Sequence, residues 1–410
     1  MRWAGQSVTV EDPAALPGLG RARDIVRTVR TPEFEGVTFH EVRARSALNH
    51  LPRAPWAADV HWTLNPYRGC THACVYCFAR QTHSYLELDT GADFDNQIVV
   101  KTNVVEVLRA ELRRPSWNRE TVAMGTNTDP YQRAEGRYRL MPGIIRALTE
   151  HGTPFTLLTK GTMLGRDVPL LGEASRSVSV QVSVSVALLD PQLQHSLEPG
   201  TPDPRARLDL ISRVRDAGLS CGVLVAPVLP YLTDSPEALE ALVDRLASAG
   251  ATSISGVPLR LVPGAREWFL RWLSAERPDL VEPYRRLYRG GSQPPAGYVE
   301  EVRRRLSEAV RRAGLHHPGV GHGRVEGGPG SGGTADDGAV ESAPWPMRTA
   351  LDGPRPAPAG PTDSRSVIQP SNPSSPPSPS SPAPPSRSPR ATSHRDGTPA
   401  GAREPAPTLF

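Results

Sequence analysis

Three of the four cysteines in this 410-residue chain lie within one short run, residues 70–77. Cys70, Cys74 and Cys77 follow a C-x₃-C-x₂-C spacing. Thiolates are soft ligands that bind iron–sulfur clusters or zinc. A structural zinc site or a closed cluster takes four ligands, whereas this run offers three. A cluster bound here would keep one iron open for a substrate or cofactor, so the spacing predicts a catalytic iron–sulfur cluster.

Zinc remains an alternative for the same run, with His72 as the fourth ligand. The place of His72 between two cysteines makes a tetrahedral arrangement difficult, and no second ligand pair follows at zinc-ribbon spacing. Cys221 stands alone and is expected to be buried in the core. Cysteines in this arrangement do not form the disulfide framework of a small secreted protein.

The elements that must position the cysteine run alternate between short strands and amphipathic helices. Apolar and β-branched runs predict six strands, at residues 61–64, 121–126, 154–160, 177–186, 220–228 and 253–261. One helix is expected to follow the capping residue Ser235, with Pro236 in its first turn and Gly250 at its end. This alternation predicts an α/β fold, a partial or complete (β/α) barrel with its site at the strand carboxyl ends.

The predicted strand at residues 177–186 alternates valine with serine or glutamine. A period of two places the valines on one face and the polar residues on the other. A polar face on a central strand would line a wet barrel interior, while an exposed edge strand would show the same alternation. Both interpretations stay open.

Composition divides the chain into three regions. Residues 1–52 have weak periodicity and are expected to form an N-terminal extension, and residues 53–315 hold the barrel. Residues 316–410 are rich in proline, serine and glycine and are expected to be a disordered tail, either passive or partner-binding.

Charge and hydropathy limit the class of protein. Lysine and arginine total 47 against 43 acidic residues, a net charge of +4 that permits nucleic-acid binding without arguing for it. The first residues lack the apolar segment of a signal peptide, and no apolar run reaches membrane-spanning length. We therefore expect a cytoplasmic protein with no membrane contact.

The cysteine run resembles the signature of the radical S-adenosylmethionine (SAM) superfamily, including the aromatic Tyr76 before the third cysteine. More narrowly, the chain resembles the spore photoproduct lyase-like group and its uncharacterised actinobacterial members. The segments that carry this resemblance are 65–80 (NPYRGCTHACVYCFAR), 125–132 (GTNTDPYQ), 157–167 (LLTKGTMLGRD), 185–190 with Glu198-Pro199, and 226–230 (APVLP).

The resemblance implies a [4Fe–4S] cluster whose open iron binds SAM. It implies an enzyme that reductively cleaves SAM to a 5′-deoxyadenosyl radical, with a flavodoxin- or ferredoxin-like reductant and an unidentified substrate. It also assigns SAM contacts to six residues, most at or near predicted strand ends: Tyr76, Thr128, Lys160, Ser183, Ser185 and Ala226. Tyr76 and Ala226 would lie near the adenine, and Lys160 would bind the SAM carboxylate.

Some of these positions have plainer interpretations. Lys160 is one of only two lysines in this arginine-rich chain, which suggests that its position requires a compact, flexible positive charge. It could equally be a solvated surface residue. Thr128 could be a turn residue. Asp129 and Glu135 could join a polar cluster near SAM or could cap helices.

The chain departs from spore photoproduct lyases in one respect. Those enzymes carry a hydrogen-donating cysteine just before the position of Thr128, where this chain has none. A DNA-repair lyase therefore remains an alternative, with nucleic acid as a possible partner. It would need a basic stripe, for which the candidates are Arg303, Arg304, Arg305, Arg311 and Arg312, unless these form a solvated helix face. A second alternative is a zinc-stabilised binding module without catalysis.

Overall fold

A computed structural model describes residues 25–51 and 60–315 of the chain. Its larger sheet has seven strands in the order β11-β10-β9-β8-β7-β4-β3. The strands are β3 (Leu48–His50), β4 (Trp62–Leu64), β7 (Val122–Met124), β8 (Phe155–Thr159), β9 (Val180–Ser185), β10 (Cys221–Val228) and β11 (Ser253–Pro258). All neighbours pair in parallel except β3, which is antiparallel to β4. Because β3 and β11 end the order, the sheet is an open, partial barrel.

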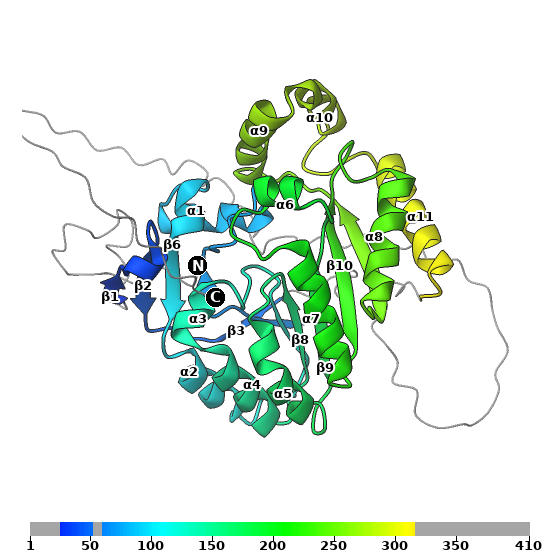
Figure 1. The fold of residues 1–410 in the computed structure, drawn as a ribbon. Coiled ribbons are helices and arrows are strands. Elements are labelled where there is room, and N and C mark those ends of the chain that lie inside the picture. The colour runs from blue at the N-terminus through cyan, green and yellow to red at the C-terminus, as the bar shows by residue number, and fades with distance from the viewer. Residues whose placement is uncertain (1–24, 52–59, 316–410) are drawn as a thin grey trace, which may run out of the picture. The chain divides into compact units, whose positions relative to one another are not determined.

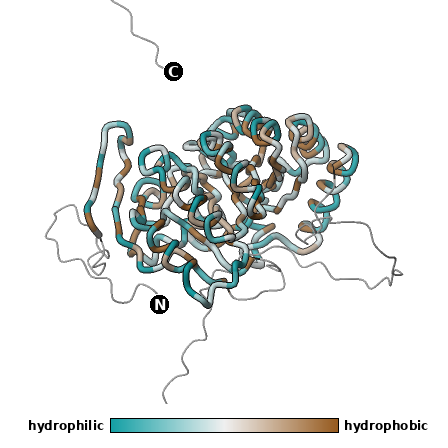
Figure 2. The backbone as a smooth tube through the Cα atoms, turned by 90° about the horizontal axis from the view of Figure 1, so that it is seen from below, coloured by the Kyte–Doolittle hydropathy of each residue, from teal (hydrophilic) through white to brown (hydrophobic). Residues whose placement is uncertain are grey.

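The six predicted strands are confirmed as β4 and β7–β11, the parallel part of this sheet. Helices between the strands supply the crossovers: α2 (Val104–Leu112), α4 (Met141–Glu150), α5 (Leu164–Ala174), α7 (Pro204–Asp216) and α8 (Pro236–Ser248). Helix α11 (Ala296–Arg312) follows the last described strand and packs against α8 and β11. Figure 1 shows how these helices and strands are arranged, and their buried side chains share one hydrophobic core. Figure 2 shows hydrophobic and hydrophilic residues alternating along the helical turns, as helices with one buried face require.

Helix α8 begins and ends as the sequence predicts. The Ser235 hydroxyl accepts a hydrogen bond from the Ala238 backbone N–H at 3.1 Å, and Pro236 occupies the first turn. Gly250 follows the helix with a φ of +91°, a left-handed conformation that glycine adopts without strain.

Strand β9 lies between β8 and β10, so the edge-strand interpretation of its alternation is wrong. Val182 and Val184 are buried in the core that the helices cover. On the opposite face, Gln181 is exposed, Ser183 is half-buried and Ser185 is buried. The polar face therefore belongs to a central strand, as the barrel interpretation expects.

A second, four-stranded sheet has the order β1-β2-β6-β5. Its strands are β1 (Ile25–Val29), β2 (Thr38–Val42), β5 (Tyr67–Arg68) and β6 (Gln97–Lys101). The short elements η2 (Pro32–Phe34), η3 (Phe78–Leu86), α1 (Ala92–Asn96) and α3 (Ala134–Tyr138) complete this half of the fold. Residues 25–50 thus supply strands to both sheets.

Three further helices and a short turn of helix lie at the carboxyl ends of the strands: α6 (Pro191–Leu197), α9 (Ala265–Glu276), η4 (Pro278–Leu280) and α10 (Val281–Leu287) (Figure 1). A second hydrophobic cluster joins α9 and α10 to the cysteine run, with Phe269, Tyr284 and Tyr288 packed near Val75 and Tyr76.

The predicted tail, residues 316–410, lies outside the described residues. The predicted boundary between residues 52 and 53 lies outside them too, so both stay predictions. Within residues 25–51 and 60–315, every helix is too short or too polar to cross a membrane.

Candidate active site at the strand ends

The cysteine loop, residues 69–77, leaves β5 and leads into η3. Gly69 has a φ of +75°, a left-handed conformation that favours glycine, and a Cβ there would lie 3.0 Å from the Gln97 carbonyl oxygen. The Cys70 N–H donates to the Phe94 carbonyl at 2.9 Å. Gln132, fully buried, accepts from the Thr71 N–H at 2.9 Å and donates to the Gly69 carbonyl at 3.0 Å. These bonds fix the start of the loop.

Arg80 fixes the other end of the loop. Its guanidinium is fully buried and donates two hydrogen bonds to the Cys74 carbonyl, at 3.1 and 2.9 Å. It also donates to the Gly91 carbonyl at 2.7 Å and pairs with Asp95 at 2.9 Å. A planar fork that satisfies several acceptors at once suits arginine and not lysine.

The three thiols of the loop form a site of soft donors. Cys70 and Cys74 are buried, and Cys77 is half-buried. Burial first, and then the neighbouring Cys70, raise the pKa of Cys77 to about 11. Burial and then the Glu198 carboxylate raise the pKa of Cys74, while the Lys160 ammonium opposes them. Three adjacent thiols beside a cation fit an iron–sulfur cluster, which binds thiolates.

His72 does not complete a zinc site in this structure. Its Nδ1 lies 3.3 Å from Asp129 Oδ2, and both side chains are largely buried. Burial opposes the charged ring, but Asp129 and then Cys70 outweigh it and raise the pKa of His72 to about 10. Among the described residues, no three or more His, Cys, Asp or Glu side chains are arranged to hold a single metal ion.

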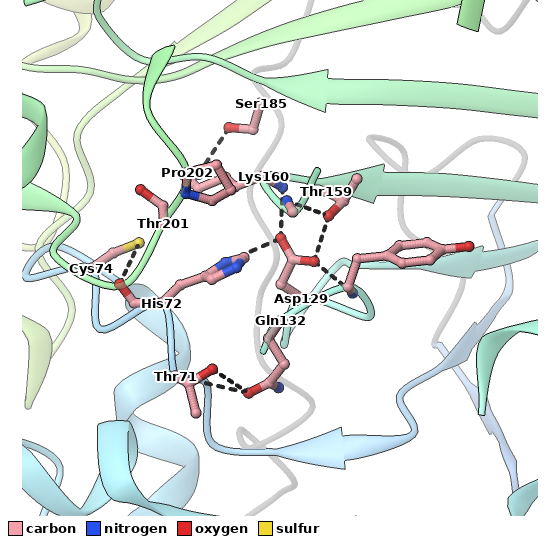
Figure 3. Close-up of polar contacts among 12 residues, drawn as sticks. Thr71, His72, Cys74, Asp129, Gln132, Thr159, Lys160, Ser185, Thr201 and Pro202 are labelled. Carbon is pink, nitrogen blue, oxygen red and sulfur yellow. Dashed lines mark hydrogen bonds and ion pairs between the residues drawn. The ribbon is translucent and has the colours of Figure 1, made fainter. Parts of the chain in front are cut away.

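Lys160 lies directly after β8, beside the cysteine loop (Figure 3). Its ammonium donates to the Ser185 hydroxyl at 2.9 Å and lies 5.9 Å from the centre of the Tyr76 ring. Its backbone N–H donates to Asp129 Oδ2 at 2.6 Å. The structure therefore brings together three of the six residues assigned to SAM, which favours a site role for Lys160 over a surface role.

The other three residues assigned to SAM differ in their surroundings. The Ala226 carbonyl accepts from the Ser185 hydroxyl at 3.5 Å, so Ala226 adjoins the same group. Ser183 lies one pleat earlier on β9, with its hydroxyl against Gly222 of β10. Thr128 is buried, and its hydroxyl donates to the Tyr67 carbonyl at 3.0 Å. That bond anchors β5, and a SAM contact of Thr128 stays a prediction.

Sequence reasoning did not assign a role to the buried ion pair of Glu198 and Arg207. The Tyr76 hydroxyl donates to Glu198, and Arg207 pairs with the other oxygen of that carboxylate. Arg207 also donates to the Ser185 carbonyl at 3.2 Å. Burial alone would raise the pKa of Glu198, but Arg207 and then Lys160 lower it to about 2. The pair thus holds the Tyr76 ring and the end of β9 together.

The segment around Glu198 also packs on the cysteine loop through its backbone. The Val75 N–H donates to the Leu197 carbonyl at 2.9 Å, and the Gly200 N–H donates to the His72 carbonyl at 3.0 Å. A Cβ on Gly200 would lie 1.9 Å from the Thr71 carbonyl oxygen, so this close approach requires glycine. The Glu198-Pro199 pair in the sequence was the available signal for this contact.

Two acidic residues that the sequence leaves open have different roles. Asp129 belongs to the polar group at the site, through His72 and Lys160. Glu135 caps α4 by accepting from the Leu140 and Met141 N–H groups, each at 3.0 Å, and it also accepts from the Tyr67 hydroxyl at 2.5 Å.

Four of the five arginines of α11 that could form a basic stripe are paired with carboxylates. Arg303, Arg304 and Arg305 pair with Glu300 and Glu301 on the same helix, and Arg312 pairs with Glu240. A solvated, ion-paired helix face is the better description of these residues. Cys221 is fully buried in the main core, as expected.

The fold is an open α/β barrel, and three cysteines and a lysine lie at its strand ends. Comparison with known proteins identifies the family in which this combination occurs. The family model of the radical SAM superfamily matches residues 64–246, and the chain belongs to this superfamily. The Uncharacterized protein Rv2578c of Mycobacterium tuberculosis is 56% identical over 325 residues, covering 78% of this chain and 95% of that protein. The Uncharacterized protein Mb2609c of Mycobacterium bovis gives the same values.

Among solved structures, the fold is similar to a spore photoproduct lyase mutant with bound AdoMet and dinucleoside spore photoproduct. The TM-score is 0.51 at 16% identity, covering 67% of this chain and 79% of that one. The two chains share the fold.

Proposed function

We propose that this protein is a radical SAM enzyme that binds a [4Fe–4S] cluster on Cys70, Cys74 and Cys77 and cleaves SAM reductively. One observation carries the proposal: Lys160 and Ser185 lie together at the strand ends, next to Tyr76 of the three-cysteine loop. Active sites of (β/α) barrels lie at this edge. The cluster and SAM together would supply a 5′-deoxyadenosyl radical that abstracts hydrogen from a substrate.

The protein's own side chains would bind and orient SAM. The Lys160 ammonium would pair with the SAM carboxylate, since a point charge on a flexible stem can follow that group. The Tyr76 ring, held by Glu198, would line the adenine, and the Ser185 hydroxyl and Ala226 carbonyl would supply polar contacts nearby. Helices α9 and α10 pack against the cysteine loop through apolar side chains, which would exclude water from that side.

We further propose a flavodoxin- or ferredoxin-like protein as electron donor and the cytoplasm as the location. A reducing compartment protects a cluster on half-buried thiols such as Cys77. The substrate is unassigned, and the zinc-binding alternative gains no support from the contact of His72 with Asp129.

A second candidate is a lyase that repairs nucleic acid, favoured by the shared fold with spore photoproduct lyase. The segment from Met124 to Thr128 holds no cysteine, and Cys221 is buried in the core. A lyase of this kind would therefore need a hydrogen donor other than cysteine, and four of the five α11 arginines that could contact nucleic acid are ion-paired.

Anaerobic turnover tests both candidates. The reconstituted protein is incubated with SAM and dithionite, alone and with ultraviolet-damaged oligonucleotides, and products are identified by mass spectrometry. We expect 5′-deoxyadenosine from the wild type and none from a Cys74→Ala variant. Conversion of the damaged base would favour the lyase. A cluster-loaded protein that forms no 5′-deoxyadenosine would contradict the proposed function.

A further inference from the structure

Asp129 collects hydrogen-bond donors from three segments that are far apart in the sequence (Figure 3). Its Oδ1 accepts from the Tyr131 N–H at 2.8 Å and from the Thr159 hydroxyl at 2.5 Å. Its Oδ2 accepts from the Lys160 N–H at 2.6 Å and lies 3.3 Å from His72 Nδ1. The side chain is only 10% exposed, so water cannot readily replace these partners.

The two oxygens of Asp129 have different partners and different consequences. The bond from Oδ1 to the N–H two residues later is the turn motif that aspartate and asparagine commonly form, and the Thr159 hydroxyl adds a bond from β8 to the same oxygen. Oδ2 instead joins two separate parts of the site. His72 lies between Cys70 and Cys74 on the cysteine loop, whereas the Lys160 N–H lies at the end of β8. One oxygen atom therefore links the cysteine loop to the backbone that carries Lys160.

We propose that Asp129 is a positioning residue for SAM, which acts by fixing Lys160 relative to the cysteine loop. The inference rests on the proposed function, because it assumes that Lys160 binds SAM. The polar contacts continue from Asp129 through the Lys160 backbone to its ammonium and on to Ser185. A long lysine side chain loses conformational entropy when it binds an anion. If the Lys160 backbone is already fixed, less freedom remains to be lost on binding, so the entropic cost is lower.

The competing explanation is that Asp129 only stabilises its own turn. Asp129→Asn separates the two explanations, because asparagine keeps one oxygen for the Tyr131 N–H and replaces the other with an amide NH₂. That NH₂ would face the Lys160 N–H, donor against donor. A turn role predicts unchanged SAM binding in this variant, whereas a positioning role predicts weaker binding.

The experiment is a calorimetric SAM titration of the full-length, cluster-reconstituted protein, with iron content and thermal melting measured on the same samples. For Asp129→Asn we expect about tenfold weaker SAM binding with unchanged iron content, since a charge-assisted bond is lost. Asp129→Asn combined with Lys160→Ala should bind no more weakly than Lys160→Ala alone, because Asp129 acts through Lys160.

Glu111→Gln is the matched control. The Glu111 carboxylate is also buried and accepts two backbone N–H groups, from Ala47 at 3.0 Å and Leu48 at 2.9 Å, but it lies in α2 and outside the site. We expect its SAM affinity to equal that of the wild type, whatever its melting temperature.

Wild-type SAM affinity in Asp129→Asn, an additional loss in the double variant, or loss of iron in Asp129→Asn would each overturn the proposal. If Asp129→Asn is insoluble, Thr159→Val removes one donor from Asp129 and should weaken SAM binding a few-fold, and unchanged affinity would overturn the proposal. Normal SAM binding by Lys160→Ala would instead refute the proposed SAM site itself.

Discussion

The Lys160 ammonium and the Ser185 hydroxyl, 2.9 Å apart, join the ends of two neighbouring parallel strands. In the register of β8 and β9, Leu158 pairs with Ser183 and Thr159 with Val184. One residue further along the chain, Lys160 follows β8 and Ser185 ends β9. The pairing of the two strands therefore places both side chains at the same edge of the sheet. An anion bound there would meet a cation and a hydroxyl that are already oriented.

The cysteine triad should be separable from the fourth cysteine. Alanine at Cys70, Cys74 or Cys77 should abolish the cluster, while Cys221→Ala should retain about four irons per chain and the visible absorption that reduction bleaches. Iron analysis and EPR after anaerobic reconstitution make the measurement. A triad variant that keeps its cluster, together with a Cys221→Ala variant that loses it, would refute the assignment.

Lys160→Ala should keep the cluster and lose SAM affinity by roughly thirty-fold or more, because a carboxylate in a partly dry site loses its cation. Lys160→Arg should restore only part of the affinity, since a planar fork does not replace a point charge. SAM titration measures both variants. Arg109→Ala, which removes a half-exposed ion pair between α2 and α4, is the control and should bind SAM normally.

Arg207→Met should destabilise the protein strongly, because it leaves the Glu198 carboxylate buried without its cation. The expected cost is about 3–5 kcal/mol in the free energy of unfolding, measured with urea. The double variant Glu198→Gln with Arg207→Met should recover much of this stability, because neither charge remains. A double variant less stable than Arg207→Met would show that the pair does not act as a unit.

Acid should weaken the folded state through Glu198. Its pKa is about 2 in the folded protein against an ordinary value of 4.5, so the carboxylate contributes stability above pH 4.5 and loses it as the pH falls toward 2. Unfolding by urea between pH 6 and pH 3 measures this. The double variant Glu198→Gln with Arg207→Met should show a shallower loss, and equal slopes would contradict the assignment.

Arg80→Lys should lower iron content although the charge is retained. Lysine cannot bond the Cys74 and Gly91 carbonyls and Asp95 together, so the cysteine loop would lose its clamp. Iron per chain after reconstitution is the measurement, and Arg109→Lys is the control. Wild-type iron content in Arg80→Lys would show that the backbone bonds of the loop suffice.

The sequence by itself determined the features that local patterns encode. The spacing of Cys70, Cys74 and Cys77 predicts a metal site, which stays a prediction, and apolar runs correctly predicted the six parallel strands and helix α8. Lys160 and Ser185 could be placed at strand ends because parallel strands bring their carboxyl ends to one edge.

Only the tertiary structure decided which polar residues support that site. Tyr76 and Glu198 are 122 residues apart in the sequence. His72 of the cysteine loop also contacts Asp129, which belongs to a distant segment. The second sheet likewise pairs β2 with β6, two distant segments. Carboxylates and arginines have no periodic signature that distinguishes a buried bridge from a solvated surface pair. Their roles depend on which partners folding brings within hydrogen-bond distance, and local sequence does not encode that.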